Sequence, residues 1–131
     1  MNFIIISTLL HYISIYPLLI YNNYYELLYI FIIIISTTFS VLYHYYQEAN
    51  LFINIIDYSL AFLWLIYDLI FALYIHHLFE IALSNIFIFL INIYIPYNYY
   101  YKYLHTIWHI LSAIKCFYVS TLIKTYPIYI K

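Results

Sequence analysis

The chain has 131 residues, of which 69% are hydrophobic and 7% are charged. Soluble domains carry about 25% charged residues, so this composition excludes a water-soluble globular domain and indicates an integral membrane protein. The formal net charge of -1 and the lack of a basic run argue against nucleic acid as a partner, and the absence of glycine argues against phosphate-binding loops.

The apolar segments predict one all-α domain, residues 1–131, built as a polytopic transmembrane helix bundle. A helix that spans a bilayer needs about 20 mostly apolar residues, so the chain has room for about five spans joined by short turns. Strands are not expected, because the apolar runs are long, lack a two-residue alternation and would leave open sheet edges in lipid. We place the spans at residues 3–21, 25–46, 51–75, 78–95 and 104–123.

The first two spans lead up to a polar turn. The segment 3–21 starts without a basic region and has no cleavage site, so we expect it to be retained rather than removed as a signal peptide. Pro17 should bend this segment locally at most, and the polar pair Asn22 and Asn23 should end it. The second span, 25–46, precedes the polar stretch 47–50.

The remaining spans follow at short intervals. The third should end at His76 and His77, and the fourth at Pro96. The tyrosine-rich run 97–103 is typical of an aromatic belt at a membrane interface. Cys116 in the fifth span is the only cysteine, which excludes a disulfide within the chain, and we interpret it as an inert buried thiol.

Polar side chains inside the spans are few. Charged or titratable groups cost a few kcal/mol each in hydrocarbon, so they need partners or a watery cavity. Ser36, Ser40 and His44 recur at intervals of four residues in the second span and therefore share one helix face. His44 lies in the last turn of this span.

The order of the spans places a second set of polar residues at the same depth. Asp57 lies near the start of the third span, and His105 and His109 lie near the start of the fifth. Because consecutive spans run in opposite directions, the end of the second span and the starts of the third and fifth face the same side. His44, Asp57 and the histidine pair should therefore share one membrane leaflet.

These residue types suit a zinc site. Three neutral imidazoles and an open fourth position are typical of catalytic zinc, so we predict His44, His105 and His109 as ligands. Asp57 could fix a histidine tautomer or take a proton from bound water, and Ser40 could donate a hydrogen bond to a developing oxyanion.

The alternative is that each histidine only satisfies a hydrogen bond between helices. We favour this interpretation for the other three histidines, which are His11, His76 and His77.

The runs Ser40-Val-Leu-Tyr-His44 and His105-Thr-Ile-Trp-His109-Ile-Leu-Ser, with Asp57 between them, resemble the superfamily of intramembrane hydrolases formed by alkaline ceramidases, progestin and adipoQ receptors and post-GPI-attachment lipases. Its pattern is S-x-x-x-H on the second helix, Asp on the third and H-x-x-x-H on the last. The run around the histidine pair is most similar to the ceramidase version.

This resemblance implies a zinc-dependent hydrolase, with Ser40 and Asp57 assisting catalysis, that cleaves a lipid amide or ester entering from the membrane. It also implies an endomembrane location such as the endoplasmic reticulum or Golgi. Members usually have seven helices, so this chain would be a reduced version with one span instead of three between Asp57 and the histidine pair. Ceramidases also carry an acidic, tryptophan-containing segment, associated with calcium binding, before the first helix. No such segment is visible before the first span of this sequence.

Two further charges lie deeper in the spans. Asp68 is eleven residues after Asp57 and so returns to nearly the same helix face, and Lys115 follows the histidine pair. We expect either a structural ion pair or a polar wall of the substrate cavity.

Three functions are compatible with the sequence. The first is a zinc-dependent lipid hydrolase, with membrane lipids as substrate. The second is a scaffold or receptor-like membrane protein whose zinc site is only structural. The third is a small channel or a subunit of a larger complex, which would bind no zinc.

Overall fold

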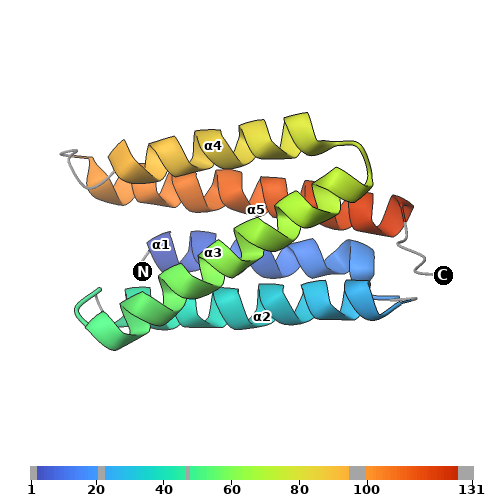
Figure 1. Ribbon diagram of the computed structural model, residues 1–131. Helices are drawn as coiled ribbons and strands as arrows, with labels where there is room; N and C mark the ends of the chain where they lie inside the picture. Colours follow the sequence, from blue (N-terminus) through green and yellow to red (C-terminus); the bar gives the residue numbers. More distant parts are fainter. Residues whose placement is uncertain (1–2, 21–22, 47, 95–99, 127–131) are drawn as a thin grey trace.

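Helices make up all the regular structure in the described part of the chain. The structure is a computed structural model and describes residues 3–20, 23–46, 48–94 and 100–126. The predicted all-α helix bundle is confirmed (Figure 1). In chain order, the elements are α1 (Phe3–Leu9), the 3-10 helix η1 (Leu10–Leu18), α2 (Tyr24–Tyr45), α3 (Leu51–Tyr74), α4 (Leu78–Tyr94) and α5 (Tyr101–Thr125).

The helix boundaries fall within three residues of the predicted ones, and side-chain caps explain two of the starts. The side-chain oxygen of Asn23 accepts a hydrogen bond from the backbone N–H of Glu26 at 2.9 Å. That of Asn50 accepts one from the N–H of Ile53 at 3.1 Å. Such caps satisfy backbone donors that the first helical turn leaves free.

The start of α5 differs from the prediction. The fifth helix begins at Tyr101 rather than at residue 104. Tyr101–Tyr103, which we assigned to the aromatic belt, form its first turn. Residues 97–99 of that belt, Pro96 and Asn22 lie outside the described residues. The third helix ends as expected, with Ile75 as its cap and His76 in the left-handed region at φ 61°.

The first segment is not the uniform helix that we predicted, because only its first half is α-helical. The Thr8 carbonyl, which would accept the Tyr12 N–H in an α-helix, accepts a hydrogen bond from His11 Nδ1 at 2.9 Å. Pro17 lacks an N–H altogether. Both features weaken the α-helical pattern and favour the tighter 3-10 pattern that continues to Leu18.

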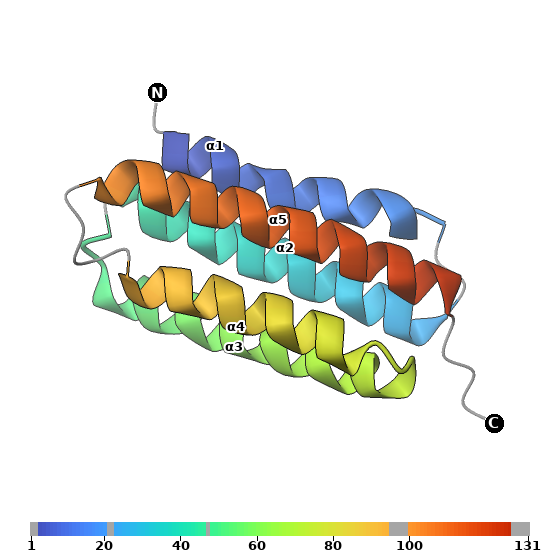
Figure 2. The same cartoon turned by 90° about the horizontal axis from the view of Figure 1, so that it is seen from above.

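The helices form layers that run along a common direction. Figure 2 shows α3 and α4 on one side, α2 and α5 in the middle, and α1 with η1 on the far side. The first segment packs against both α2 and α5, whereas α4 packs against α3 and α5. In Figure 1, α3 crosses obliquely from the level of α2 to the level of α4.

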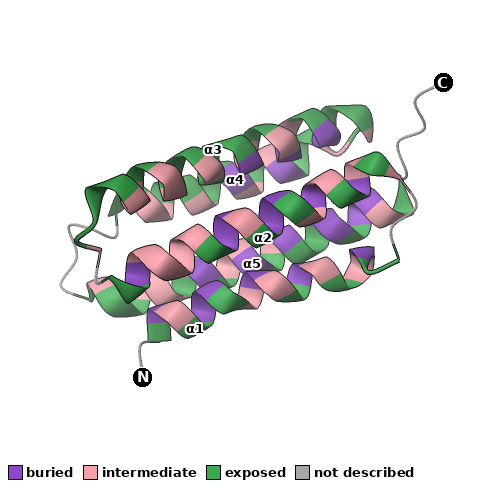
Figure 3. Cartoon of the chain, turned by 90° about the horizontal axis from the view of Figure 1, so that it is seen from below, coloured by how far each residue is buried: buried purple, intermediate pink, exposed green. Residues whose placement is uncertain are grey.

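The apolar core occupies one half of the bundle, at the end where α3 leads into α4. The buried residues of α3 all fall in its second half, and the side chains buried along α4 and α5 include several in the same half (Figure 3). This core consists of Leu18, Tyr29, Ile32, Ile33, Trp64, Phe71, Ala72, Ile81, Cys116, Val119, Leu122 and Ile123. The other half of the bundle holds the polar residues of the predicted site.

The outer surface of the bundle is strongly apolar. α2, α3 and α5 are long and apolar enough to cross a membrane, and Phe3–Leu18 and α4 are apolar but shorter. Large side chains such as Phe62, Phe79 and Phe87 are exposed on this surface. A surface of this kind is consistent with a membrane protein, because lipid would cover it.

Candidate metal site

Three histidines from two helices meet in the polar half of the bundle. His44 lies in the last turn of α2, and His105 and His109 lie on one face near the start of α5. One nitrogen from each ring lies within 4.8 Å of those of the other two. His44 and His109 are buried and His105 is partly buried. This group can hold a metal ion.

The nitrogens of His44 and His109 are slightly closer together than two ligands of a small tetrahedral ion. Nε2 of His44 and Nε2 of His109 are 2.9 Å apart. Two nitrogens at about 2.0–2.1 Å from a tetrahedral ion are separated by about 3.3 Å, so His44 and His109 would move apart slightly to admit it. The ring of His105, whose nitrogen lies within 4.8 Å of both, would complete the group. The rings of His105 and His109 stack at 4.9 Å with an angle of 14° between their planes, which holds them side by side.

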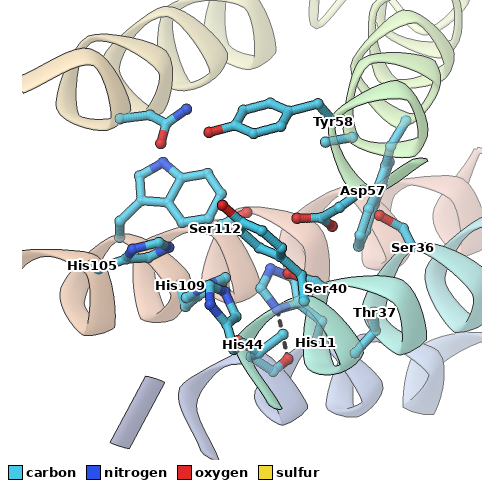
Figure 4. A pocket seen from close by; sticks show the side chains of 16 residues that line it. His11, Ser36, Thr37, Ser40, His44, Asp57, Tyr58, His105, His109 and Ser112 are labelled. Atoms are coloured by element: carbon cyan, nitrogen blue, oxygen red, sulfur yellow. Dashed lines mark hydrogen bonds between the residues drawn. The ribbon is translucent and has the colours of Figure 1, made fainter. Parts of the chain in front are cut away.

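Ser40 and Asp57 lie in the same cavity as the histidines. The cavity has a volume of about 110 Å³, and all the helical elements contribute to its wall. Asp57 reaches it from α3, and Ser40, one turn before His44 on α2, neighbours the Asp57 carboxylate (Figure 4). The structure therefore brings together all five residues that the sequence indicated, although Asp57 is not part of the close nitrogen group.

One side chain in the wall of this cavity has a polar atom without a partner. Thr37 Oγ1 is buried and makes no hydrogen bond within the described residues. A buried hydroxyl without a partner is costly, and water or a polar ligand in the cavity would satisfy it. The cavity is thus suited to polar contents.

Comparison with known proteins gives no match to a protein-family model, a curated protein or a solved structure.

His11 is a fourth histidine in this cavity, and the sequence interpretation did not place it there. Its ring contacts those of His109 and Trp64 edge to face, at 5.9 Å and 5.7 Å between centroids. Its Nδ1 donates to the Thr8 carbonyl, as a purely structural histidine would, but the ring also lines the cavity. The signal was present in the sequence, because Ser7, Thr8, His11 and Ser14 recur at helical spacing and all four are buried.

Glu48 and Tyr101 were also missed, although both lie four residues from a histidine of the site. Glu48 Oε1 is 3.0 Å from His44 Nδ1, and its other oxygen accepts a hydrogen bond from the Tyr101 hydroxyl. The Tyr101 oxygen is 2.8 Å from His105 Nδ1. The hydrogen bonds from His44 and Tyr101 hold the pKa of the Glu48 carboxyl below its usual range, although partial burial opposes this.

The other two histidines lie at the opposite end of the bundle. His76 is exposed, and His77 Nδ1 is 2.7 Å from Glu80 Oε2 at the start of α4. We expected His77 to make a hydrogen bond between helices, but its partner lies only three residues further along the chain. Their distance from the cavity makes these residues useful controls for metal binding.

Asp68 and Lys115 form the predicted ion pair between α3 and α5. Asp68 is fully buried and also accepts a hydrogen bond from the Tyr29 hydroxyl at 2.8 Å, and Trp64 Nε1 donates to the same hydroxyl at 3.0 Å. Neither charged residue lines the cavity. The pair therefore belongs to the packing of the bundle. It lies beside the cavity, because Lys115 Nζ is 5.7 Å from the ring centre of Trp64, which lines the cavity.

The arrangement combines a metal-binding group with a carboxylate and hydroxyls across a small cavity. Three imidazole nitrogens from α2 and α5 lie within 4.8 Å of one another, and Asp57 lines the same cavity from α3. A carboxylate placed beside such a position can accept a proton, and a neighbouring hydroxyl can donate a hydrogen bond to a charged oxygen. These are the groups that a metal-assisted hydrolysis requires.

Proposed function

We propose that the protein is a zinc-dependent intramembrane hydrolase that cleaves a lipid amide or ester, and a short member of the superfamily that its motifs resemble. One observation carries this proposal. His44, His105 and His109 lie with Ser40 and Asp57 in one polar cavity, whereas the outer surface of the bundle is apolar. Polar groups are costly within a membrane, and their concentration at one point favours a functional site.

The proposal treats all five helical segments as spans. Phe3–Leu18 has too few residues for an ordinary span, but nine of them are in a 3-10 helix, which rises about 2.0 Å per residue instead of about 1.5 Å. The segment is therefore about 28 Å long, close to the hydrocarbon thickness of about 30 Å. α4 reaches about 25 Å, which a slight thinning of the bilayer accommodates.

Zinc is the metal that we propose for the three histidines. Imidazole suits zinc, and three histidines with an open position are the usual ligand set of a catalytic zinc ion. When bound, zinc supplies Lewis-acid chemistry, since it polarises a carbonyl group and makes water more acidic.

The side chains around the metal group supply the remaining steps. Asp57 takes a proton from the water that adds to the carbonyl carbon, and Ser40 donates a hydrogen bond to the carbonyl oxygen as it gains negative charge. The carbon–nitrogen or carbon–oxygen bond then breaks, and Asp57 returns the proton to the leaving group. The products are a carboxylic acid and an amine or alcohol.

The size of the cavity fits the reacting group of a lipid rather than a whole lipid. About 110 Å³ holds several water molecules or one amide or ester group with its neighbours, but not an acyl chain. The chains would stay in the surrounding hydrocarbon, against the apolar faces of the helices. The cavity size is compatible with any N-acyl or O-acyl lipid, and the resemblance of the motifs to alkaline ceramidases favours ceramides among them.

The test is hydrolysis of a lipid panel by the zinc-loaded protein in mixed micelles, with released fatty acid measured by mass spectrometry. We expect wild type to cleave at least one ceramide or ester lipid. Asp57→Asn should bind zinc but lose activity by about 10²–10⁴-fold, because the general base is removed. His76→Asn with His77→Gln, at the other end of the bundle, should match wild type.

Two results would contradict the proposal. Zinc binding by wild type without hydrolysis of any lipid would favour a scaffold or receptor-like protein with a structural zinc site. Full activity of Asp57→Asn would remove this residue from the reaction.

A further inference from the structure

We propose that Glu48 is the residue that positions two of the metal ligands, His44 directly and His105 through Tyr101. This inference rests on the metal site of the proposed function, but it does not depend on whether that site hydrolyses lipids. It assigns a role to a turn residue outside the motifs that indicated the site.

The hydrogen bonds form a continuous chain around the outside of the histidine group. His44 Nδ1 is 3.0 Å from Glu48 Oε1, Tyr101 donates its hydroxyl proton to Glu48 Oε2, and His105 Nδ1 is 2.8 Å from the Tyr101 oxygen. The chain joins the end of α2 to the start of α5. It therefore links the two helices that carry the ligands.

The direction of each proton follows from this chain. An ionised carboxylate only accepts hydrogen bonds, so His44 must carry its proton on Nδ1. Tyr101 has one hydroxyl proton and gives it to Glu48, so its oxygen must accept the proton of His105 Nδ1. Both histidines then have their lone pair on Nε2.

A lone pair on Nε2 is what metal binding requires here. His44 Nε2 is the atom that faces His109 at 2.9 Å, on the inner side of the group. Carboxylates that accept from the outer nitrogen of a ligating histidine fix its tautomer, orient its ring and raise its basicity. Glu48 does this directly for His44, and it acts on His105 by accepting the hydrogen bond of the Tyr101 hydroxyl, so that the Tyr101 oxygen accepts from His105.

The backbone of Glu48 gives a second, independent observation. Its φ is 62°, in the left-handed region that glycine, asparagine and aspartate favour and glutamate does not. Its N–H donates to the Tyr43 carbonyl at 3.0 Å, which secures the turn at this position. Glu48 therefore occupies a turn position that asparagine would favour, and from this position its side chain makes both site contacts.

If Glu48 positions the histidines, Asp57 is not needed for that role. The sequence indicated two alternative roles for Asp57, which were to fix a histidine tautomer or to take a proton from water. With Glu48 holding the outer nitrogens, Asp57 faces the cavity from α3 and is available for the proton. The two acidic residues thus act on opposite sides of the metal group.

Glu48→Gln tests the proton directions with little change in shape. A glutamine side chain has one acceptor oxygen and one donor NH2, so it cannot accept from both His44 and Tyr101. One histidine would lose its partner or switch to the wrong tautomer. We expect zinc to bind with a Kd that is about 10–100-fold higher than in wild type.

Glu48→Asn and Tyr101→Phe complete the set of variants. Asparagine suits the left-handed backbone and should keep the turn, but its side chain is too short to reach the same partners, so affinity should fall as in Glu48→Gln. Tyr101→Phe removes only the link to His105, and we expect a smaller loss of about 10-fold. The matched control is Glu80→Gln, because Glu80 also contacts a histidine and a tyrosine, His77 and Tyr118, far from the cavity.

The measurement is zinc affinity of the detergent-purified protein by competition with a chelator, together with the visible spectrum after cobalt substitution and the Tm of the metal-free protein. Weaker binding and an altered cobalt spectrum in both Glu48 variants, with an unchanged metal-free Tm and a normal Glu80→Gln, would support the inference. Equal zinc affinity in wild type and Glu48→Gln would overturn it and leave the metal site intact. A parallel fall in metal-free Tm in both variants would show a structural role and would also overturn it, whereas no zinc in wild type would overturn the site itself.

Discussion

At the scale of single residues, the proposed zinc site depends most directly on the ring nitrogens of His44, His105 and His109. Loss of two of the three nitrogens leaves too few ligands for a stable zinc site. We expect about one zinc per chain in wild type and none in His105→Ala with His109→Ala, measured by elemental analysis of the detergent-purified protein.

The control for this measurement uses the histidines at the far end of the bundle. His76→Asn with His77→Gln also removes two imidazoles but should keep the wild-type zinc content. Asparagine is chosen for position 76 because His76 has a positive φ. The proposed site would be contradicted if both double variants lost zinc equally, or if the wild-type protein contained no zinc.

Single residues also show where sequence reasoning succeeds and where it stops. The three histidines, Ser40 and Asp57 could be found because helical spacing gives the face and the order of spans gives the depth. Glu48 could not, since the direction of its side chain depends on a turn with a positive φ that no periodic pattern records. Tyr101 was assigned to an interfacial belt, and only the earlier start of α5 brings it one turn before His105.

At the scale of helices, the ion pair between Asp68 and Lys115 ties α3 to α5. Asp68 is fully buried, so removal of Lys115 leaves an uncompensated charge with Tyr29 as its remaining partner. We expect Lys115→Met to destabilise the protein by about 3–5 kcal/mol. The double variant Asp68→Asn with Lys115→Met should be clearly more stable than Lys115→Met alone.

Thermal unfolding in detergent measures this difference, and zinc content gives the control. Neither charged residue lines the cavity, so both variants should still bind zinc while folded. An equal loss of stability in the single and double variants would mean that the two charges do not act as a pair.

The helices themselves were predictable from the sequence except for the 3-10 segment. Long apolar runs and the capping residues Asn23 and Asn50 locate the boundaries closely. The change to a 3-10 helix depends on His11 taking the Thr8 carbonyl, which is a matter of side-chain direction rather than hydrophobicity. The same contact turns His11 towards the cavity.

For the whole molecule, the sequence predicted a common leaflet for the site but not the division of the bundle into two halves. The parity of the spans was enough to place His44, Asp57 and the histidine pair at one end. Which helices pack together depends on side-chain shape, and the sequence gives no direct measure of that. The structure adds that the apolar core fills one half and so leaves the other for the polar cavity.

The number of spans can be tested on the whole molecule, and the site depends on it. With five spans, the turns after α2 and α4 face one side of the membrane, and the turn after α3 and the end of α5 face the other. We expect Ala49→Cys and Tyr100→Cys, each in a Cys116→Ala background, to react with an impermeant maleimide from the same side of sealed vesicles. His76→Cys and Tyr126→Cys should react only from the opposite side, since all four positions are exposed. If Tyr100→Cys were labelled together with His76→Cys, α4 would not cross the membrane. His44 and His105 would then start from opposite faces, and the metal site could not form in a bilayer.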